Sequence, residues 1–130
     1  MSQKLTILFD LDGTLINTAP DLMNAHNHVM RKYGYKEKNI SDIKKLAGRG
    51  SKVMLTRSLS DSTNIKEFED KIDKMTKEFI NYYSKNISKE STLKKGLLDF
   101  LSWCKKKSIS LGVCTNKQEH LSIDLLKKIK

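Results

Sequence analysis

The chain has 130 residues, of which 38% are hydrophobic and 31% are charged, and its formal net charge is +10. This length suits one domain, or a small domain with an insertion, and the composition is typical of a soluble globular protein. No apolar run approaches the ~20 residues of a membrane-spanning helix, and Asp10 and Asp12 interrupt any signal-peptide pattern. We therefore expect a cytoplasmic protein with no membrane partner.

The positive charge is spread along several segments, and nearly all of it comes from lysine. Only Arg31, Arg49 and Arg57 are arginine. Proteins that read nucleic acid usually combine arginine forks with interleaved aromatic residues, and both are scarce here. We expect no nucleic-acid partner, although a basic nucleic-acid-binding module stays open as an alternative. An attraction for anionic small molecules fits the charge equally well.

The chain opens with an apolar run from Leu5 to Phe9 that ends in two aspartates, Asp10 and Asp12. The run is long enough for one buried strand. Alternate side chains of an extended chain face the same side, so both carboxylates point one way and Leu11 the other. Two carboxylates at the mouth of a buried strand are costly unless a cation or strong donors meet them. This pair is the first indication of chemistry.

Helical patterns follow the opening strand. Thr18 is expected to cap a helix that Gly34 ends, and Ser41 is expected to cap a second helix over about 40–46. Gly48-Arg49-Gly50 breaks the pattern before helical spacing resumes over 53–59. One continuous helix is expected from 65 to about 83 because its apolar residues recur at three- and four-residue steps. These residues are Ile65, Phe68, Ile72, Met75 and Phe79.

A polar linker is expected over 86–95, then a helix over 96–107, a second strand over 109–114, and a helix from about 118 to the C-terminus. The second strand ends in Thr115-Asn116, so polar side chains again follow an apolar run. Cys104 and Cys114 lie among apolar neighbours, and we expect both to be reduced thiols in the core.

Strands and helices alternate at the two ends of the chain, which predicts an α/β fold with a parallel sheet. Ligands of such sheets bind outside the carboxyl ends of the strands, where Asp10, Asp12, Thr115 and Asn116 are expected to meet. The number of residues between the two strands far exceeds what one crossover helix needs. We therefore expect a core formed by residues 1–15 and 87–130, with residues 16–86 inserted as a helical cap.

Asp10-Leu11-Asp12-Gly13-Thr14 resembles motif one of the haloacid dehalogenase superfamily of phosphatases, and Val113-Cys114-Thr115-Asn116 resembles motif two. The resemblance implies a Rossmann-like parallel sheet with an inserted α-helical cap, and Mg²⁺-dependent phosphoryl transfer through an aspartyl-phosphate. It implies that Asp10 is the nucleophile and a metal ligand. Asp12 is implied to protonate the leaving oxygen, activate water and bind the metal, while Thr115 and Asn116 hold the phosphoryl group.

These residue types suit that chemistry. A carboxylate attacks phosphorus only when the repulsion between two anions is relieved, and Mg²⁺ bridging both groups relieves it. Carboxylate oxygens are ligands that Mg²⁺ prefers. The structural alternative for Asp10 and Asp12 is a simple turn pair at the end of a strand.

Within the superfamily, the chain resembles phosphoglycolate phosphatases, which implies a small phosphorylated metabolite as substrate, with 2-phosphoglycolate as the best choice. The resemblance rests on Asn17-Thr18-Ala19-Pro20-Asp21-Leu22, Gly48-Arg49-Gly50 and Thr115-Asn116-Lys117. It implies that Gly48 and Gly50 form a cap loop over the substrate and that Arg49 meets a distal carboxylate. An ordinary helix-breaking turn and a surface lysine at position 117 remain the alternatives. Related pyrophosphatases and sugar-phosphate mutases share this style of cap.

The resemblance ends early, because neither the third-motif lysine nor the fourth-motif acidic pair follows Thr115. Two parallel strands do not make a well-buried sheet, and missing neighbours leave its edges open. We therefore expect an incomplete chain with weak or no phosphatase activity alone. A non-catalytic remnant that binds an anion or a partner chain is the second hypothesis.

Overall fold

The computed structural model describes residues 3–61 and 63–129. In this part of the chain the strands are β1 (Thr6–Phe9), β2 (Ile16–Asn17), β3 (Thr92–Leu93) and β4 (Ser110–Val113). The helices are α1 (Ala19–Tyr33), α2 (Ile40–Leu46), α3 (Ser51–Ser60), α4 (Ile65–Phe68), α5 (Ile72–Lys85), α6 (Leu97–Lys106) and α7 (Glu119–Lys128).

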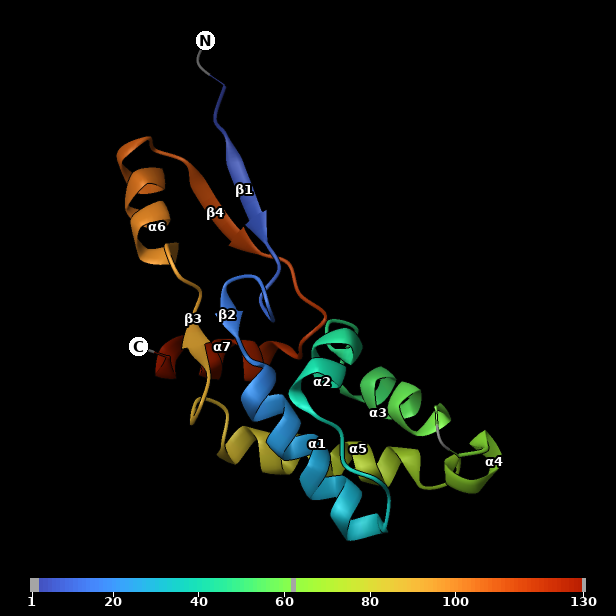
Figure 1. The fold of residues 1–130 in the computed structure, drawn as a ribbon. Coiled ribbons are helices and arrows are strands. Elements are labelled where there is room, and N and C mark those ends of the chain that lie inside the picture. Colours follow the sequence, from blue (N-terminus) through green and yellow to red (C-terminus); the bar gives the residue numbers. More distant parts are fainter. Residues whose placement is uncertain (1–2, 62, 130) are drawn as a thin grey trace.

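The first and last strands form a parallel pair, as the sequence predicts. β1 and β4 run from Thr6 opposite Ser110 to Phe9 opposite Val113. The backbone N–H of Cys114 continues the ladder by donating to the carbonyl of Phe9 at 2.8 Å. Helix α6 lies beside this pair, at the opposite end of the molecule from α2–α5 (Figure 1). The carboxyl ends of β1 and β4 therefore lie next to each other.

A second, shorter ladder was not expected. β2 pairs antiparallel with β3, within the stretches that enter and leave the helical region. Asp21, in the first turn of α1, reinforces this junction. Its carboxylate is 2% exposed and accepts hydrogen bonds from the Glu90 N–H, the Ser91 N–H and the Ser91 hydroxyl. One buried side chain thus ties α1 to the segment that leads into β3.

Helices α1 to α5 pack together around one apolar core. α1 contacts α5 and α2, and α3 contacts α5. The expected apolar stripe of α1 is confirmed, because all its members are buried. These are Leu22, Ala25, Val29 and Met30. The expected helix end is confirmed too, since Gly34 follows Tyr33 with a φ of 75°, a left-handed conformation that favours glycine.

Two local predictions for this helical region are wrong, and one is confirmed only in part. Asn39, not Ser41, caps α2, because its side-chain oxygen accepts from the Asp42 N–H at 2.9 Å. Thr18 is the N-cap residue of α1 as expected, but its side chain makes no capping hydrogen bond. The expected continuous helix over 65–83 is divided into α4 and α5 by a turn. This turn keeps Phe68 buried while leaving Ile65 52% exposed, outside the apolar face.

The expectation of buried strands is also wrong. Leu8 on β1 is 66% exposed, and Leu111 and Val113 on β4 are 43% and 41% exposed. The reason is that, among the described residues, β1 pairs with β4 alone, so both outer edges lack a neighbouring strand. Cys104 is a buried free thiol as expected, whereas Cys114, which directly follows β4, is exposed.

An apolar cavity of about 310 Å³ lies along this uncovered region. It is lined by Phe9, Leu15, Ile16, Leu93, Leu97, Leu98, Leu101, Leu111, Gly112, Val113, Leu126 and Ile129. Several of these side chains, with Leu98 at 66% and Leu126 at 44%, are strongly exposed.

Among the described residues, no helix is both long enough and apolar enough to cross a bilayer.

Candidate functional site

The polar residues that follow β1 and β4 come together at one edge of the parallel pair. Asp10 and Asp12 follow β1, and Thr115, Asn116 and Lys117 follow β4. Asp10 is exposed, and one of its carboxylate oxygens accepts from the Leu11 N–H at 2.8 Å. The hydroxyl of Thr115 accepts from the Lys117 N–H at 3.1 Å. The parallel register explains this meeting of two segments that lie far apart in the sequence.

Asp12 and Lys117 form an ion pair that is nearly withdrawn from solvent. The Lys117 Nζ lies 2.8 Å from Asp12 Oδ1, and the side chains of Lys117 and Asp12 are 5% and 11% exposed. The same ammonium lies 4.5 Å from the centre of the Tyr83 ring, a cation–π geometry. Lys117 is therefore not a surface lysine, and the alternative that treated it as one is wrong.

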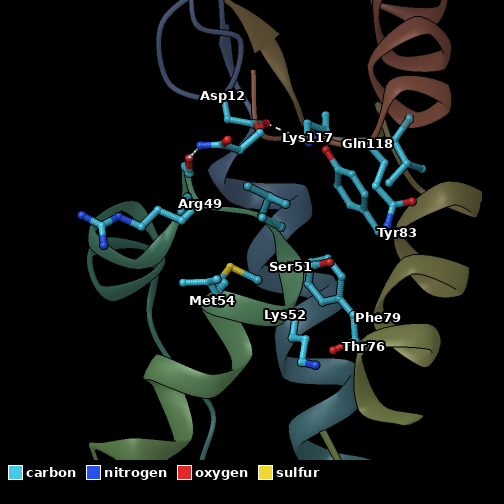
Figure 2. A pocket seen from close by; sticks show the side chains of 17 residues that line it. Asp12, Arg49, Ser51, Lys52, Met54, Thr76, Phe79, Tyr83, Lys117 and Gln118 are labelled. Carbon is cyan, nitrogen blue, oxygen red and sulfur yellow. Dashed lines mark hydrogen bonds and ion pairs between the residues drawn. The ribbon is translucent and has the colours of Figure 1, made fainter. Parts of the chain in front are cut away.

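A cavity of about 360 Å³, which we call the site cavity, opens beside this ion pair. Figure 2 shows side chains from the strand ends and from the helical region meeting around it. Among the described residues it is lined by Asp12, Leu22, Ala47, Gly48, Arg49, Gly50, Ser51, Lys52, Val53, Met54, Thr76, Phe79, Tyr83, Asn116, Lys117, Gln118 and Leu121. Asp12, Asn116 and the 48–50 loop thus share one cavity, whereas Asp10 and Thr115 lie outside its lining.

The 48–50 loop is held against the strand ends. The side-chain N–H of Asn116 donates to the Gly48 carbonyl at 2.9 Å. Gly50, with a φ of 90°, lies close enough that a Cβ there would be 3.7 Å from the Asn116 carbonyl oxygen. The exposed side chain of Arg49 points away from Asp12 in Figure 2. Glycine at position 50 permits the positive φ, whereas the 3.7 Å approach is an ordinary van der Waals contact that a Cβ would tolerate.

The charges that line the site cavity favour an anion. Arg49, Lys52 and Lys117 are cationic, and Asp12 is the acidic residue among the described lining residues. Lys52 is partly neutralised by Asp73, 2.8 Å away, outside the lining. Lys117 has further N–H donors besides the one that Asp12 accepts. The cavity is therefore suited to a small, negatively charged ligand.

The described residues form no cluster of three or more His, Cys, Asp or Glu side chains that could hold a metal. The two carboxylates after β1 nevertheless suit Mg²⁺, which commonly binds one or two carboxylates and completes its shell with water and substrate phosphates. His26 is buried on α1, where both of its ring nitrogens lie within hydrogen-bond distance of neighbouring side chains. Its Nδ1 lies 2.8 Å from the Asn27 Oδ1, and its Nε2 lies 2.7 Å from the Ser58 hydroxyl.

Sequence reasoning missed Tyr83 as a site residue. It was treated as the end of an apolar helix, and its 1% exposure agrees with packing. Its hydroxyl, however, lies beside Asp12 and Lys117 at the cavity wall (Figure 2). Tyr83 lies four residues after Phe79, so the helical spacing was the available signal. The spacing predicts which face Tyr83 occupies, but not that this face reaches the strand ends.

Comparison with known proteins relates this chain to one family. The family model for haloacid dehalogenase-like hydrolases matches residues 7–130. A phosphoglycolate phosphatase of Agrobacterium fabrum is 36% identical over 123 residues, covering 94% of this chain and 52% of that protein. The phosphoglycolate phosphatase of Caulobacter vibrioides is 36% identical over 121 residues, covering 93% of this chain and 51% of that protein. The chain spans about half the length of these relatives.

Solved structures share the fold. A crystal structure described as a predicted phosphoglycolate phosphatase from Haemophilus somnus superposes with a TM-score of 0.79 at 28% identity, covering 92% of this chain and 55% of that one. CbbY from Rhodobacter sphaeroides, solved in complex with phosphate, gives a TM-score of 0.73 at 20% identity. That match covers 98% of this chain and 57% of that one. The expected α/β fold with a partial parallel sheet is confirmed.

Proposed function

Because the chain belongs to the haloacid dehalogenase-like hydrolase family, we propose that its site cavity binds a small phosphorylated metabolite for phosphate-ester hydrolysis. 2-Phosphoglycolate is our choice of substrate, since relatives at 36% identity are named phosphoglycolate phosphatases. The observation that carries the proposal is the buried Asp12–Lys117 pair, which places an acid and a cation at a cavity whose other charged lining residues, among those described, are Arg49 and Lys52. A cytoplasmic location and the division into core (1–15, 87–130) and cap (16–86) belong to the same proposal.

The proposed roles follow the chemistry of each side chain. The exposed Asp10 carboxylate attacks phosphorus, so the P–O bond to the leaving group breaks while a bond to Asp10 forms. Asp12 gives its proton to the leaving oxygen. It later takes a proton from a water that attacks phosphorus, so the P–O bond to Asp10 breaks and inorganic phosphate is released. Since Asp12 Oδ1 is bonded to Lys117 in this structure, a bound phosphoryl group has to draw the ammonium toward itself before Asp12 is protonated.

Other residues hold the ligand. The Thr115 hydroxyl and the Asn116 backbone lie at the end of β4, where they contribute to phosphate binding. Gly48 and Gly50 shape the cap loop, and Arg49 meets the distal carboxylate after its side chain turns toward the cavity. Asp10 and Asp12 are the proposed protein ligands of Mg²⁺. When bound, the ion offsets the repulsion between the carboxylate and the phosphoryl group.

Binding and release assays on residues 1–130 test this function. We expect 2-phosphoglycolate and inorganic phosphate to bind in Mg²⁺ buffer, as measured by isothermal titration calorimetry, with weak or no release of phosphate. Asp12→Asn is expected to alter the binding of both ligands, whereas Asp124→Asn, an exposed control on α7, leaves binding unchanged. Absence of binding by the unaltered chain would refute the proposal. Rapid Mg²⁺-dependent release that Asp10→Asn abolishes would overturn only the expectation of weak activity.

The second candidate function, binding of a partner chain, is favoured by the uncovered β1–β4 pair and its apolar cavity. Exposed apolar side chains beside open strand edges are typical of surfaces that another polypeptide covers. Analytical ultracentrifugation of residues 1–130 tests this candidate. A strictly monomeric chain that binds phosphate would favour the first function, and self-association lost in Leu8→Lys would favour the second.

A further inference from the structure

The hydroxyl of Tyr83 is an unusual feature of the site cavity. Tyr83 lies near the C-terminal end of α5 and is 1% exposed. Within the part of the chain that the structure describes, its hydroxyl oxygen is buried and has no hydrogen-bond partner. Buried hydroxyl groups are normally paired, because leaving one unpaired costs most of its hydration energy. An unpaired hydroxyl at a cavity wall therefore needs an explanation.

The surroundings of this hydroxyl indicate what it can bind. The Tyr83 ring lies against the Lys117 ammonium, and Figure 2 shows its hydroxyl directed toward Lys117 and Asp12. Lys117 offers only donors, and none of the described acceptors, the Asp12 carboxylate included, makes a hydrogen bond with the Tyr83 hydroxyl. The hydroxyl thus needs an acceptor that the described side chains do not supply. A phosphoryl oxygen that Lys117 attracts would lie in the same region.

The protonation state of Tyr83 agrees with a donor role. Burial raises the pKa of Tyr83 well above its ordinary value, and the negative charges of Asp12 and Asp21 raise it further. The phenol therefore keeps its proton throughout the physiological range. Because the aromatic ring is packed among α5 neighbours such as Phe79, 5.8 Å between ring centres, the donor is held in place before any ligand arrives.

We propose that Tyr83 is a substrate-binding residue that α5 contributes, and that its hydroxyl donates a hydrogen bond to a phosphoryl oxygen of the ligand in the site cavity. This inference rests on the proposed function, because it needs a phosphate-bearing ligand beside Asp12 and Lys117. It adds a direct contact from the helical region to the reacting group. Ligand binding would then give the Tyr83 hydroxyl a hydrogen-bond partner and would link α5 to the strand ends through the ligand.

Tyr83→Phe tests the proposal because it removes the hydroxyl and keeps the ring over Lys117. Tyr82→Phe is the matched control, since Tyr82 is the neighbouring residue on α5, stacks on His28 and lies outside the cavity lining. Calorimetry in Mg²⁺ buffer compares 2-phosphoglycolate, inorganic phosphate and glycolate. We expect Tyr83→Phe to weaken 2-phosphoglycolate and phosphate equally, by roughly 10- to 100-fold, as for a hydrogen bond to a charged group.

Urea unfolding of the same variants separates binding from structure. Tyr83→Phe removes no hydrogen bond of the described structure, so we expect its unfolding midpoint to stay unchanged or rise. Unchanged phosphate affinity in Tyr83→Phe would overturn the proposal. A loss of affinity confined to 2-phosphoglycolate would overturn it too, because the hydroxyl would then bind the carboxylate end of that ligand. A lower midpoint with unchanged affinity would assign it to a structural water. If the unaltered chain binds neither phosphate-bearing ligand, the proposed function fails first and this inference falls with it.

Discussion

Asp21 offers the sharpest test of how the helical region is tied to the rest of the chain. Its carboxylate accepts from the Ser91 hydroxyl at 2.7 Å, from the Ser91 N–H at 2.9 Å and from the Glu90 N–H at 3.0 Å. Asp21→Ala leaves these donors without their acceptor, two of them at the buried Ser91. Hydrogen bonds to a charged group contribute about 1.5–3 kcal/mol each and are not additive, so we expect a loss of about 3–5 kcal/mol in the free energy of unfolding.

Urea denaturation of residues 1–130 measures this loss, with an unchanged m-value as evidence that the unfolded state is the same. Asp21→Asn keeps the size and one acceptor oxygen, and we expect it to lose about 1–3 kcal/mol. The control is Asp124→Asn, whose ion pair with Lys128 is exposed and contributes less than about 0.5 kcal/mol. A loss below about 1 kcal/mol in Asp21→Ala would refute the reasoning, because three bonds to one buried carboxylate cannot then be stabilising.

Three further predictions concern single side chains. Burial lowers the pKa of His26, and the charge of Lys38 lowers it further, against the opposing effect of the hydrogen bond that His26 donates to the Asn27 Oδ1, so the unfolded state binds the proton more tightly. The stability that His26 contributes is therefore complete above its ordinary pKa of 6.5, and it is lost as the pH falls through the lower folded pKa. The urea midpoint of the wild type should decline across this pH range, and the decline should be smaller in His26→Gln. Gly34→Ala should lose about 1 kcal/mol in unfolding free energy, and Gly34→Asn less, because φ is 75° there; equal midpoints for both variants and wild type would contradict this. Lys117→Met should weaken phosphate binding by at least about 10-fold in calorimetry, and unchanged affinity would remove Lys117 from the site.

Local patterns in the sequence predicted the elements that depend on neighbouring residues. The apolar run before Asp10 and the run before Thr115 became the parallel strands β1 and β4, and Gly34 ended α1. The sequence also predicted that the polar residues after these two strands lie close together, because the carboxyl ends of parallel strands share an edge. The roles of Asp10, Asp12, Thr115 and the 48–50 loop remain predictions that the proposed assays test.

Only the tertiary structure decided burial and partners, because these depend on what covers a residue and not on its neighbours in the chain. A run such as Leu8 to Phe9 has the composition of a buried strand, yet Leu8 is 66% exposed since no further described strand lies beside β1. Lys117 shows the reverse, a lysine that composition assigns to the surface and that Asp12 and the Tyr83 ring enclose. The sequence by itself determined where the strand-end carboxylates lie and the family chemistry that they imply. The parallel register of β1 and β4 brought Asp12 beside Lys117, and the position of α5 placed next to them a tyrosine hydroxyl that has no partner among the described residues.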